Sequence, residues 1–501
     1  MKKIILSLAV LALLVSSCNL DEQPQGVIPK DNSIVTIDDA EGWARYEHIY
    51  LRAYTAGSYI YTTEIASDFF NPMIDYGNRE GNEYRWDWNS GIPFVDIWGG
   101  AYSGINHACY VIETVENMDK SGFDASQLQR INYVLGVAHF TKAYFGLKLL
   151  EYYAPVYNSS NAGKYGIMLV DLHRPSGDIN SYPGRSTVEE SYNWVVNEAK
   201  TAETLLTGFA GSVASEDITI DAVHAFQARL ALYMGNWDEA IAKSTALVDG
   251  GKYPLCETQE EMTALWTNDS GKECIMQMYA NSAASSVPSS NDPSYYGLVN
   301  GQYRPDWLLN NWVANELYAT TDLRFSTWFE TRPVTTSIGT APGMILFNKF
   351  PGNTTLGAST AHIQKIKPFR IAEQYLIAAE AFAMKGGADA VACQYLDKLC
   401  IKRDATHKSL SITGDELKSF IKDERAREFI GEGFRWFDLK RWGEGMSRPA
   451  PQLAAIVHTG GSNGPALNLE VSASDHRWVA PIPIDELASN PQIREQQNPG
   501  Y

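Results

Sequence analysis

The sequence predicts a mostly helical fold in which long irregular loops are carried on paired helices. Three observations indicate this: apolar residues recur at helical spacing, two stretches have the pattern of a helix–turn–helix, and four long polar segments lack a regular pattern. Hydrophobic residues make up 45% of the chain and charged residues 20%, which is ordinary for a globular chain with a sizeable core.

Single helices are expected over 38–54, 94–117 and 128–152. The first has Asp38 or Asp39 as its expected N-cap. The third should bury one face, because apolar residues follow the 3, 4, 7, 11 spacing of a helix side. Its members are Val134, Val137, Ala138, Thr141 and Phe145.

Two further stretches resemble tetratricopeptide helix–turn–helix units. The first is 222–249, with a tight turn at Gly235 and Asn236, and the second is 374–403, with Gly386 at its turn. One unit cannot bury its apolar face alone, so neighbouring helix pairs must stack against it. The irregular spacing predicts units embedded in a larger fold, not a free-standing solenoid.

The four polar segments are 71–93, 281–303, 331–361 and 459–475. Structureless loops of this length are uncommon in compact domains unless they have a function. We therefore expect the functional surface on these loops, carried by the helical scaffold.

The N-terminus has the pattern of a lipoprotein secretion signal. Lys2 and Lys3 precede an apolar run over 4–15, which is shorter than the roughly 20 residues of a membrane-spanning helix. Small residues before Cys18 resemble a lipobox, the site where such signals are cut ahead of an acylated cysteine. The alternative is an ordinary signal followed by a coincidental cysteine.

These boundaries divide the chain into three expected parts. They are a signal peptide over 1–17, a lipid anchor at Cys18 with an extended tether over 18–37, and a single domain over 38–501. Acyl chains on Cys18 would hold the protein on a membrane, since each buried methylene contributes about 0.8 kcal/mol. The formal net charge of −18 argues against nucleic acid as a partner.

The cysteines support no metal or redox site, because Cys-x-x-Cys does not occur. Cys393 and Cys400 are two helical turns apart, roughly 10 Å, which is too far for a disulfide within one helix. Cys256 and Cys274 could pair, although nothing in the sequence requires it.

Aromatic residues in two polar loops are the candidate ligand contacts. Flat rings stack on the C–H faces of sugars, while nearby amides and charges can satisfy the hydroxyls. Trp86 and Trp88 alternate with polar residues, so on an extended backbone both rings face one way. The alternative is that each ring anchors its own loop against the core. The candidates are Tyr76, Tyr84, Trp86 and Trp88 in one loop, and Tyr295, Tyr296, Tyr303 and Trp307 in the other.

Two acidic patterns could indicate catalysis. The cluster over 424–441 interleaves Glu424, Glu428 and Asp438 with four arginines, and arginine pairs hold carboxylates ionised, so we interpret it as structural. A glycoside hydrolase needs two carboxylates on either side of a sugar. The candidates for such a pair are Glu64, Asp68, Asp75, Glu83, Asp87 and Asp96.

Other catalytic motifs do not occur in the sequence. It has no His-Glu-x-x-His, no Gly-x-Ser-x-Gly and no phosphate-binding Gly-Lys-[Ser/Thr]. We therefore expect no metal and no cofactor.

Four stretches match, in order, the motifs of one known family. They are 38–41 leading to 65–68, then 98–113, then 424–443, and finally 478–501. The third is the most specific, with Glu-Arg-Ala-Arg-Glu-Phe followed by Glu-Gly-Phe-Arg-Trp-Phe-Asp-Leu-Lys-Arg-Trp-Gly. Together they resemble the SusD/RagB family of outer-membrane nutrient-binding lipoproteins. The stretch 396–403 departs from the family pattern, as does Cys109, where asparagine is more usual.

The resemblance implies a SusD-like fold with four tetratricopeptide-like units and a partner, a TonB-dependent transporter barrel that the protein covers as a lid. Asp21 and Glu22 resemble signals that send lipoproteins to the outer face of the outer membrane. The implied function is capture of oligosaccharide on the extracellular side, without catalysis. Two alternatives stay open: the same fold binding peptide or another polymer, and a surface glycoside hydrolase.

Overall fold

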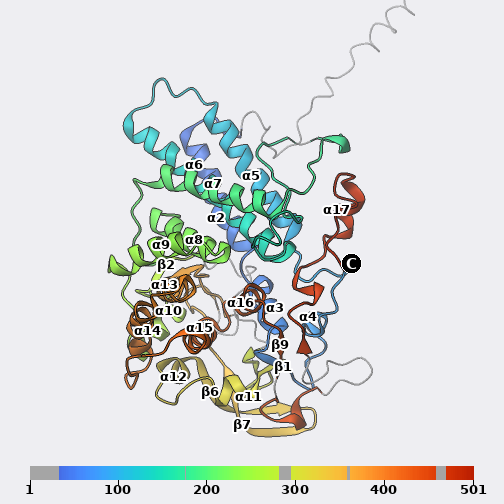
Figure 1. Cartoon of the computed structure of the whole chain (residues 1–501), viewed down its shortest axis with the longest axis vertical. Helices are drawn as coiled ribbons and strands as arrows, with labels where there is room; N and C mark the ends of the chain where they lie inside the picture. Colours follow the sequence, from blue (N-terminus) through green and yellow to red (C-terminus); the bar gives the residue numbers. More distant parts are fainter. Residues whose placement is uncertain (1–32, 175, 281–294, 358–361, 449, 459–469) are drawn as a thin grey trace, which may run out of the picture.

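The computed structural model describes residues 33–501 apart from 175, 281–294, 358–361, 449 and 459–469. The predicted signal peptide, the lipidation at Cys18 and most of the tether lie outside the described residues. Helices fill the upper and middle parts of the molecule, and a small sheet closes the lower end (Figure 1). None of the described helices has the length and apolar character needed to cross a membrane.

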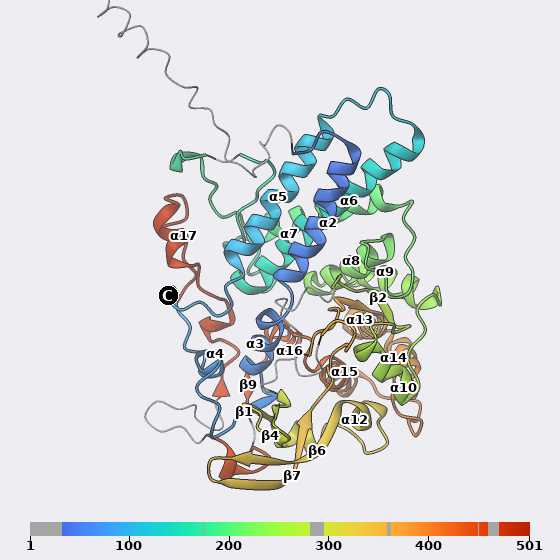
Figure 2. The ribbon, with the colours of Figure 1, turned by 180° about the vertical axis from the view of Figure 1, so that it is seen from behind.

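The upper part of the molecule is a helical layer organised around one long central helix. Its members are α2 (Ile37–Ala53), α5 (Trp98–Glu116), α6 (Ala125–Tyr153) and α7 (Val188–Leu206). Helix α6 contacts the other three, and Figure 2 shows α2 and α5 lying beside it. The predicted inner face of α6, from Val134 to Phe145, is confirmed, because its five residues are all buried.

The N-cap of α2 differs from the prediction of Asp38 or Asp39. Thr36 is the cap, and its hydroxyl accepts a hydrogen bond from the Asp39 amide at 3.2 Å. The Asp39 carboxylate accepts in return from the Thr36 amide at 2.8 Å. This is a capping box, so Asp39 stabilises the helix start from its third position instead of capping it.

The two predicted helix–turn–helix units are confirmed. They are formed by α8 (Ile220–Met234) with α9 (Trp237–Asp249), and by α13 (Ile371–Lys385) with α14 (Asp389–Arg403). Gly235 ends α8 at φ +67°, a left-handed conformation that glycine adopts without strain. Helix α13 packs against α9, so the two pairs stack as repeat units must. Helices α15 (Gly414–Phe429) and α16 (Arg435–Trp442) follow.

Short helices and strands make up the lower part. The helices are α3 (Ser58–Ala66), α4 (Gly81–Arg85), α10 (Gln259–Thr267), α11 (Asn311–Asn315) and α12 (Leu323–Trp328). Helix α17 (Ile484–Ser489) lies higher, at the side of the molecule (Figure 1). The four-stranded sheet has the order β3 (Leu298–Val299), β4 (Gln302–Tyr303), β6 (Phe329–Thr336), β7 (Gly339–Phe347). The two-stranded pairs are β1 (Phe70–Pro72) with β5 (Trp307–Leu309), β2 (Cys274–Met276) with β8 (Phe369–Arg370), and β9 (Met446–Ser447) with β10 (Glu470–Val471).

The segment 331–361 is not the irregular loop that the sequence predicts. Its first half belongs to a long antiparallel hairpin of β6 and β7, which extends along the lower edge of the molecule in Figure 2. The sequence does not predict these strands because Pro333 and Pro342 lie within them, and proline normally argues against a strand. Pro333 is accommodated because the register shifts between Arg332 and Val334.

The cluster over 424–441 is a buried ion-pair network, as predicted. Glu428 lies between Arg324, Arg370 and Arg403, and Asp438 lies between Arg425 and Arg441. The five cysteines of the described residues are buried and unpaired, Cys256 and Cys274 included.

Candidate functional site

The eight aromatic residues predicted to contact ligand lie in three separate clusters, and most have no exposed face. Tyr303 is half-buried. The exposed fractions of the others are 3% for Tyr76, 0% for Tyr84, 1% for Trp86, 3% for Trp88, 1% for Tyr295, 8% for Tyr296 and 0% for Trp307. A single arc of rings open to solvent is therefore not present in this conformation.

Trp86 and Trp88 lie side by side, with ring centroids 4.8 Å apart, but both point into the core. Trp86 packs on Trp478 at 4.6 Å and donates its indole N–H to the Ala66 carbonyl at 2.9 Å. Trp88 stacks on Phe94 at 4.3 Å. The prediction that these rings bind ligand needs correction, because the core occupies the faces that a sugar would use.

Replacement of Trp86 by phenylalanine tests this corrected role. The variant loses the hydrogen bond to Ala66 and part of the ring packing, so we expect the free energy of unfolding to fall by about 1–2 kcal/mol. We expect glycan affinity to stay unchanged, which urea unfolding and calorimetry would check. Lost affinity at unchanged stability would instead favour the original prediction.

A second cluster lies around Trp307 and is also core. Tyr84 lies 5.4 Å from the Trp307 ring and is covered by the Arg448 guanidinium at 3.7 Å. Tyr295 stacks on Phe70 at 4.6 Å with an interplanar angle of 12°. These three predicted contacts are likewise corrected to core residues, because neighbouring rings and charges cover their faces.

Beside this cluster, a surface pocket of about 410 Å³ opens between two distant segments of the chain. The segments are held together like strands: the Ile74 amide donates to the Ile456 carbonyl at 2.9 Å and the His458 amide to the Pro72 carbonyl at 2.9 Å. The pocket is lined by Ile74, Tyr76, Gly77, Asn78, Arg85 and His458.

Hydrogen bonds fix the polar groups of this pocket. Asn78 Oδ1 accepts from the Tyr76 hydroxyl at 3.1 Å and from Arg85 at 2.9 Å. Arg85 also pairs with the Asp87 carboxylate at 2.8 Å, and the Tyr76 ring contacts the His458 ring edge-on at 5.2 Å. Burial raises the pKa of Tyr76, so its phenol stays a neutral donor. The pocket presents an amide, a guanidinium and an imidazole over one aromatic wall.

The pocket sits next to the small sheet. Met73 and Ile456 pack with Tyr296 and, at its edge, Tyr303 in one apolar cluster. The Tyr296 hydroxyl donates to Glu330 at 2.9 Å, and the Arg332 guanidinium lies 5.5 Å from the Tyr303 ring. Of the eight predicted rings, Tyr76 lines the pocket and Tyr303 keeps partial exposure near it.

Sequence reasoning missed Asn78, Arg85 and His458. Gly77 and Asn78 form a turn signal, and both are left-handed in the structure, at φ +65° and +60°. Arg85 is one of the polar residues that alternate with Trp86 and Trp88, and that pattern gives it no role in binding. No local signal links His458 to this loop, because the contact joins segments more than 370 residues apart.

Two of the acidic candidates, Glu64 and Asp68, have their carboxylates held by partners inside the protein. Burial raises the pKa of Glu64 to about 7, but its carboxylate accepts from the amides of Gly431 and Gly433 and has no exposed surface. Asp68 is held by Arg435 through contacts of 2.8 and 2.9 Å. Within the described part of the chain, no group of three or more metal-ligating side chains occurs.

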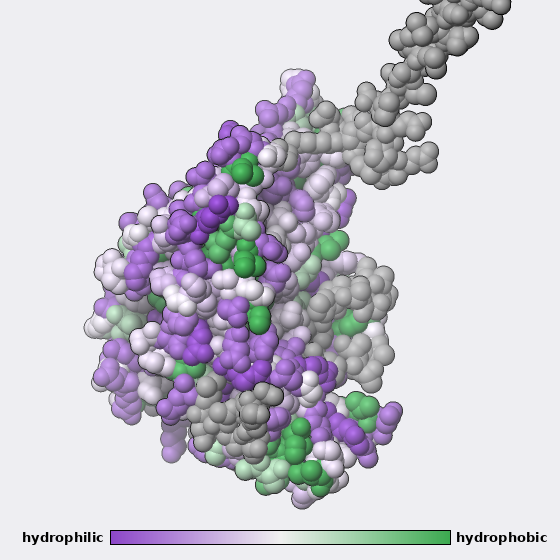
Figure 3. Space-filling view, turned by 90° about the vertical axis from the view of Figure 1, so that its right-hand side faces the viewer, coloured by the Kyte–Doolittle hydropathy of each residue, from purple (hydrophilic) through white to green (hydrophobic). Residues whose placement is uncertain are grey.

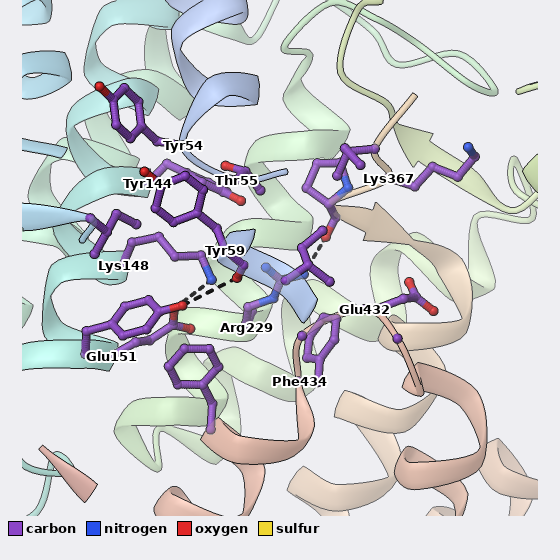
Figure 4. Close-up of a pocket in the computed structure, with 18 of the residues that line it drawn as sticks. Tyr54, Thr55, Tyr59, Tyr144, Lys148, Glu151, Arg229, Lys367, Glu432 and Phe434 are labelled. Atoms are coloured by element: carbon purple, nitrogen blue, oxygen red, sulfur yellow. Dashed lines mark hydrogen bonds and ion pairs between the residues drawn. The ribbon is translucent and has the colours of Figure 1, made fainter. Parts of the chain in front are cut away.

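A central cavity lies between α3, α6, α8 and the 431–434 turn, but its volume of about 60 Å³ holds only a few water molecules. Figure 4 shows Lys148 paired with Glu151 and Arg229 bonded to the backbone at its edge. These charges already have partners inside the protein. The cavity is too small for a sugar, so we assign it no ligand.

The described part of the face seen in Figure 3 is mostly hydrophilic, with apolar residues in small separate patches. Large apolar patches mark protein or membrane contacts. A polar ligand therefore suits this face better than an apolar one.

Two family models match the chain. The SusD family model covers residues 275–501, and a model described as starch-binding and associating with the outer membrane covers residues 31–232. SusD-like protein P38 of Formosa agariphila is 24% identical over 369 residues, which span 63% of this chain and 66% of that relative. The match thus spans slightly less than two thirds of the relative.

Solved structures show the same fold. A SusD superfamily protein from Bacteroides thetaiotaomicron aligns with a TM-score of 0.78 at 23% identity, covering 93% of this chain and 100% of that one. A laminarin-binding SusD-like protein aligns with a TM-score of 0.67 at 16% identity, covering 93% and 99%. These likenesses establish a mostly helical SusD-like architecture, as the sequence predicts.

Proposed function

The chain belongs to the SusD/RagB family, and from this premise we propose that it binds oligosaccharide outside the outer membrane and delivers it to a TonB-dependent transporter. The observation that carries the proposal is the surface pocket around Tyr76, Asn78, Arg85 and His458. Its volume of about 410 Å³ falls within the range of small-ligand sites.

The pocket has the chemistry that a sugar needs. Arg85 can donate to sugar hydroxyls, Asn78 and His458 can donate or accept, and Tyr76 forms part of the pocket wall. The loop is preorganised by the bonds of Arg85 to Asn78, Asn82 and Asp87, so little ordering is needed on binding. The name of the laminarin-binding relative supports a glycan over a peptide.

The family and the N-terminal sequence support the proposed location and partner. The name of one matching family model associates it with the outer membrane, and the lipobox-like stretch before Cys18 supports a lipid anchor. Oligosaccharide held on the extracellular side would then pass to the transporter that the protein covers. The pairing of Asp68 with Arg435 and the complete burial of Glu64 support binding without hydrolysis.

The test uses the purified protein with laminarin and starch oligosaccharides as probes. We expect saturable binding by calorimetry, and we expect the double variant Arg85→Ala/His458→Ala to weaken it at least tenfold, a loss of about 1.4 kcal/mol. Arg494→Ala is the matched control, because Arg494 is an exposed arginine outside the pocket. Chromatography of the incubated glycans should show no shortened product.

Three outcomes would overturn parts of this proposal. Binding of a peptide digest with no binding of any glycan would replace the ligand class. Shortened glycans would indicate hydrolysis and return attention to Glu64 and Asp68. Equal affinity in the double variant and the control would move the site away from this pocket.

A further inference from the structure

A second cavity, of about 500 Å³, lies in the helical repeat part of the molecule. It forms where α8 and α9 meet α13, α15 and α16, beside the loop that follows α6. Figure 1 shows α15 beside α13 and α14, with α16 nearer the centre of the molecule. The cavity thus belongs to the helical scaffold and shares no lining residue with the surface pocket. Nothing in the proposed function uses it.

Aromatic side chains form part of the lining. Trp237 is half-buried, and its indole lies beside Gly235 at the start of α9. Tyr157 is held edge-on by Tyr192 at 4.9 Å, and the Trp442 indole donates to Glu380 at 2.9 Å. Tyr157 and Trp442 are therefore held in place before any ligand arrives.

The charged part of the lining is cationic. Lys418 and Lys422 project from α15 one turn apart, and Arg441 lies beside them. Among the described residues that line the cavity, Glu380 is the one acid, and it is already bonded to Arg441 at 2.7 Å and to Trp442. The lining itself thus carries three cations and one acid, and Asp415, Asp438 and Glu444 pair with these cations from outside it.

Lys418 and Lys422 are engaged only in solvent-exposed ion pairs, which a ligand could replace. Lys418 contacts Asp415 at 3.2 Å, but that carboxylate is fully exposed. Lys422 pairs with Glu444, whose side chain is 40% exposed. Exposed pairs of this kind contribute about 0–1 kcal/mol, so an anion in the cavity could compete for both ammonium groups.

We propose that this cavity binds an acidic glycan, a sugar chain whose rings carry carboxylates. The carboxylate lies between Lys418 and Lys422, and the C–H face of the same sugar lies on Trp237. The exposed side chains of Asn158 and Ser159, also on the lining, meet the hydroxyls. This site is separate from the pocket of Tyr76 and His458 and takes a different class of sugar.

The experiment compares a galacturonate tetrasaccharide with its carboxyl-reduced, neutral counterpart by calorimetry on the purified protein. We expect the acidic form to bind and the reduced form to bind at least tenfold more weakly, a difference of about 1.4 kcal/mol. Affinity should fall as salt is raised, because partly exposed charges are screened. Glucuronate and mannuronate oligomers extend the panel.

Variants locate the site. Lys418→Gln and Trp237→Ala should each weaken binding about tenfold. Lys398→Gln on α14 is the matched control and should leave it unchanged, because Lys398 lies outside this cavity. Trp237→Phe keeps a ring against Gly235, and we expect it to retain most of the affinity even if the alanine variant fails to fold.

The proposal is overturned if no uronate oligomer binds, if the reduced form binds as tightly as the acid, or if Lys418→Gln matches Lys398→Gln. Preference for sulfated over carboxylated oligomers would also overturn it. Neutral glycan binding that depends on Arg85 and His458 is measured separately, so the two proposals can fail independently.

Discussion

Replacing Glu428 by alanine is expected to lower the free energy of unfolding by about 3–5 kcal/mol, the usual effect of removing one partner from a buried ion pair. Glu428 has no exposed surface and contacts Arg370 at 2.8 Å, Arg324 at 3.0 Å and Arg403 at 3.0 Å. These arginines come from three different elements of the chain. The carboxylate thus joins the sheet region to the helical repeats.

The pKa of Glu428 shows that its attraction to the arginines outweighs the cost of burying its charge. Burial alone would raise it, but the positive charges of Arg403, Arg370 and Arg324 outweigh burial and hold the pKa well below its usual value. A lowered carboxyl pKa contributes stability that is present above the unfolded pKa of about 4.3 and is lost as pH falls toward the folded value. The effect of the alanine variant should therefore shrink in acid.

Urea unfolding at neutral pH measures this loss. Asp238→Ala is the control: Asp238 also pairs with a cation, Lys385, but 78% of its side chain is exposed. We expect the control to change stability by less than about 0.5 kcal/mol. Similar small effects in both variants would show that the arginines are satisfied by their other partners and that Glu428 is not the centre of the network.

Local signals predicted the scaffold well because its helices are specified by their own residues. The inner face of α6 follows helical spacing, and Gly235 supplies the left-handed residue that ends α8. The interleaved charges of 424–441 likewise predicted an ion-pair network. Their outside partners, Arg324, Arg370 and Arg403, could not be identified, because those contacts span up to about a hundred residues of chain.

The candidate site was predicted poorly for a physical reason. The rings of Trp86 and Trp88 lie side by side, but not through the alternation of an extended backbone, because Trp86 ends helix α4. The sequence pattern also could not tell whether the rings face solvent or core. Trp86 adopts a left-handed conformation at φ +61°, unusual for a bulky residue, and its carbonyl is held by Arg477 at 2.9 Å. Partners from the C-terminal segment thus turn the pair inward, and the same segment supplies His458 to the pocket.

Substitution of Glu47 is the second change expected to have a large effect on the free energy of unfolding. It should stabilise the protein at high pH, whereas substitution of Glu428 should destabilise it. It lies on the buried stripe of α2 with Ala40, Ala44 and Leu51, and it has no exposed surface. Neither carboxylate oxygen has a hydrogen-bond partner among the residues that the structure describes. Burial therefore raises the pKa of Glu47 to about 8.

Because the pKa of the Glu47 carboxyl is raised in the folded protein, the free energy of unfolding falls as pH rises. Between the unfolded pKa of about 4.3 and the folded value, the Glu47 carboxyl keeps its proton in the folded protein but loses it on unfolding. The stability contributed by the protonated carboxyl is therefore fully present below this pH range. It is lost as pH rises through about 8, where the buried group must ionise. A shift of this size corresponds to about 5 kcal/mol, since one pKa unit is about 1.4 kcal/mol.

Glu47→Gln replaces the carboxyl by a neutral group of the same shape. We expect the variant and the parent to have similar stability at pH 5, and the variant to be more stable by up to about 5 kcal/mol above pH 8. Taking the difference between the two proteins at each pH cancels the titration of every other group. Glu116→Gln, at an exposed position on α5, is the control and should show no such divergence. A constant difference across pH would mean that Glu47 is ionised in the folded protein and gains a partner or water that offsets its burial.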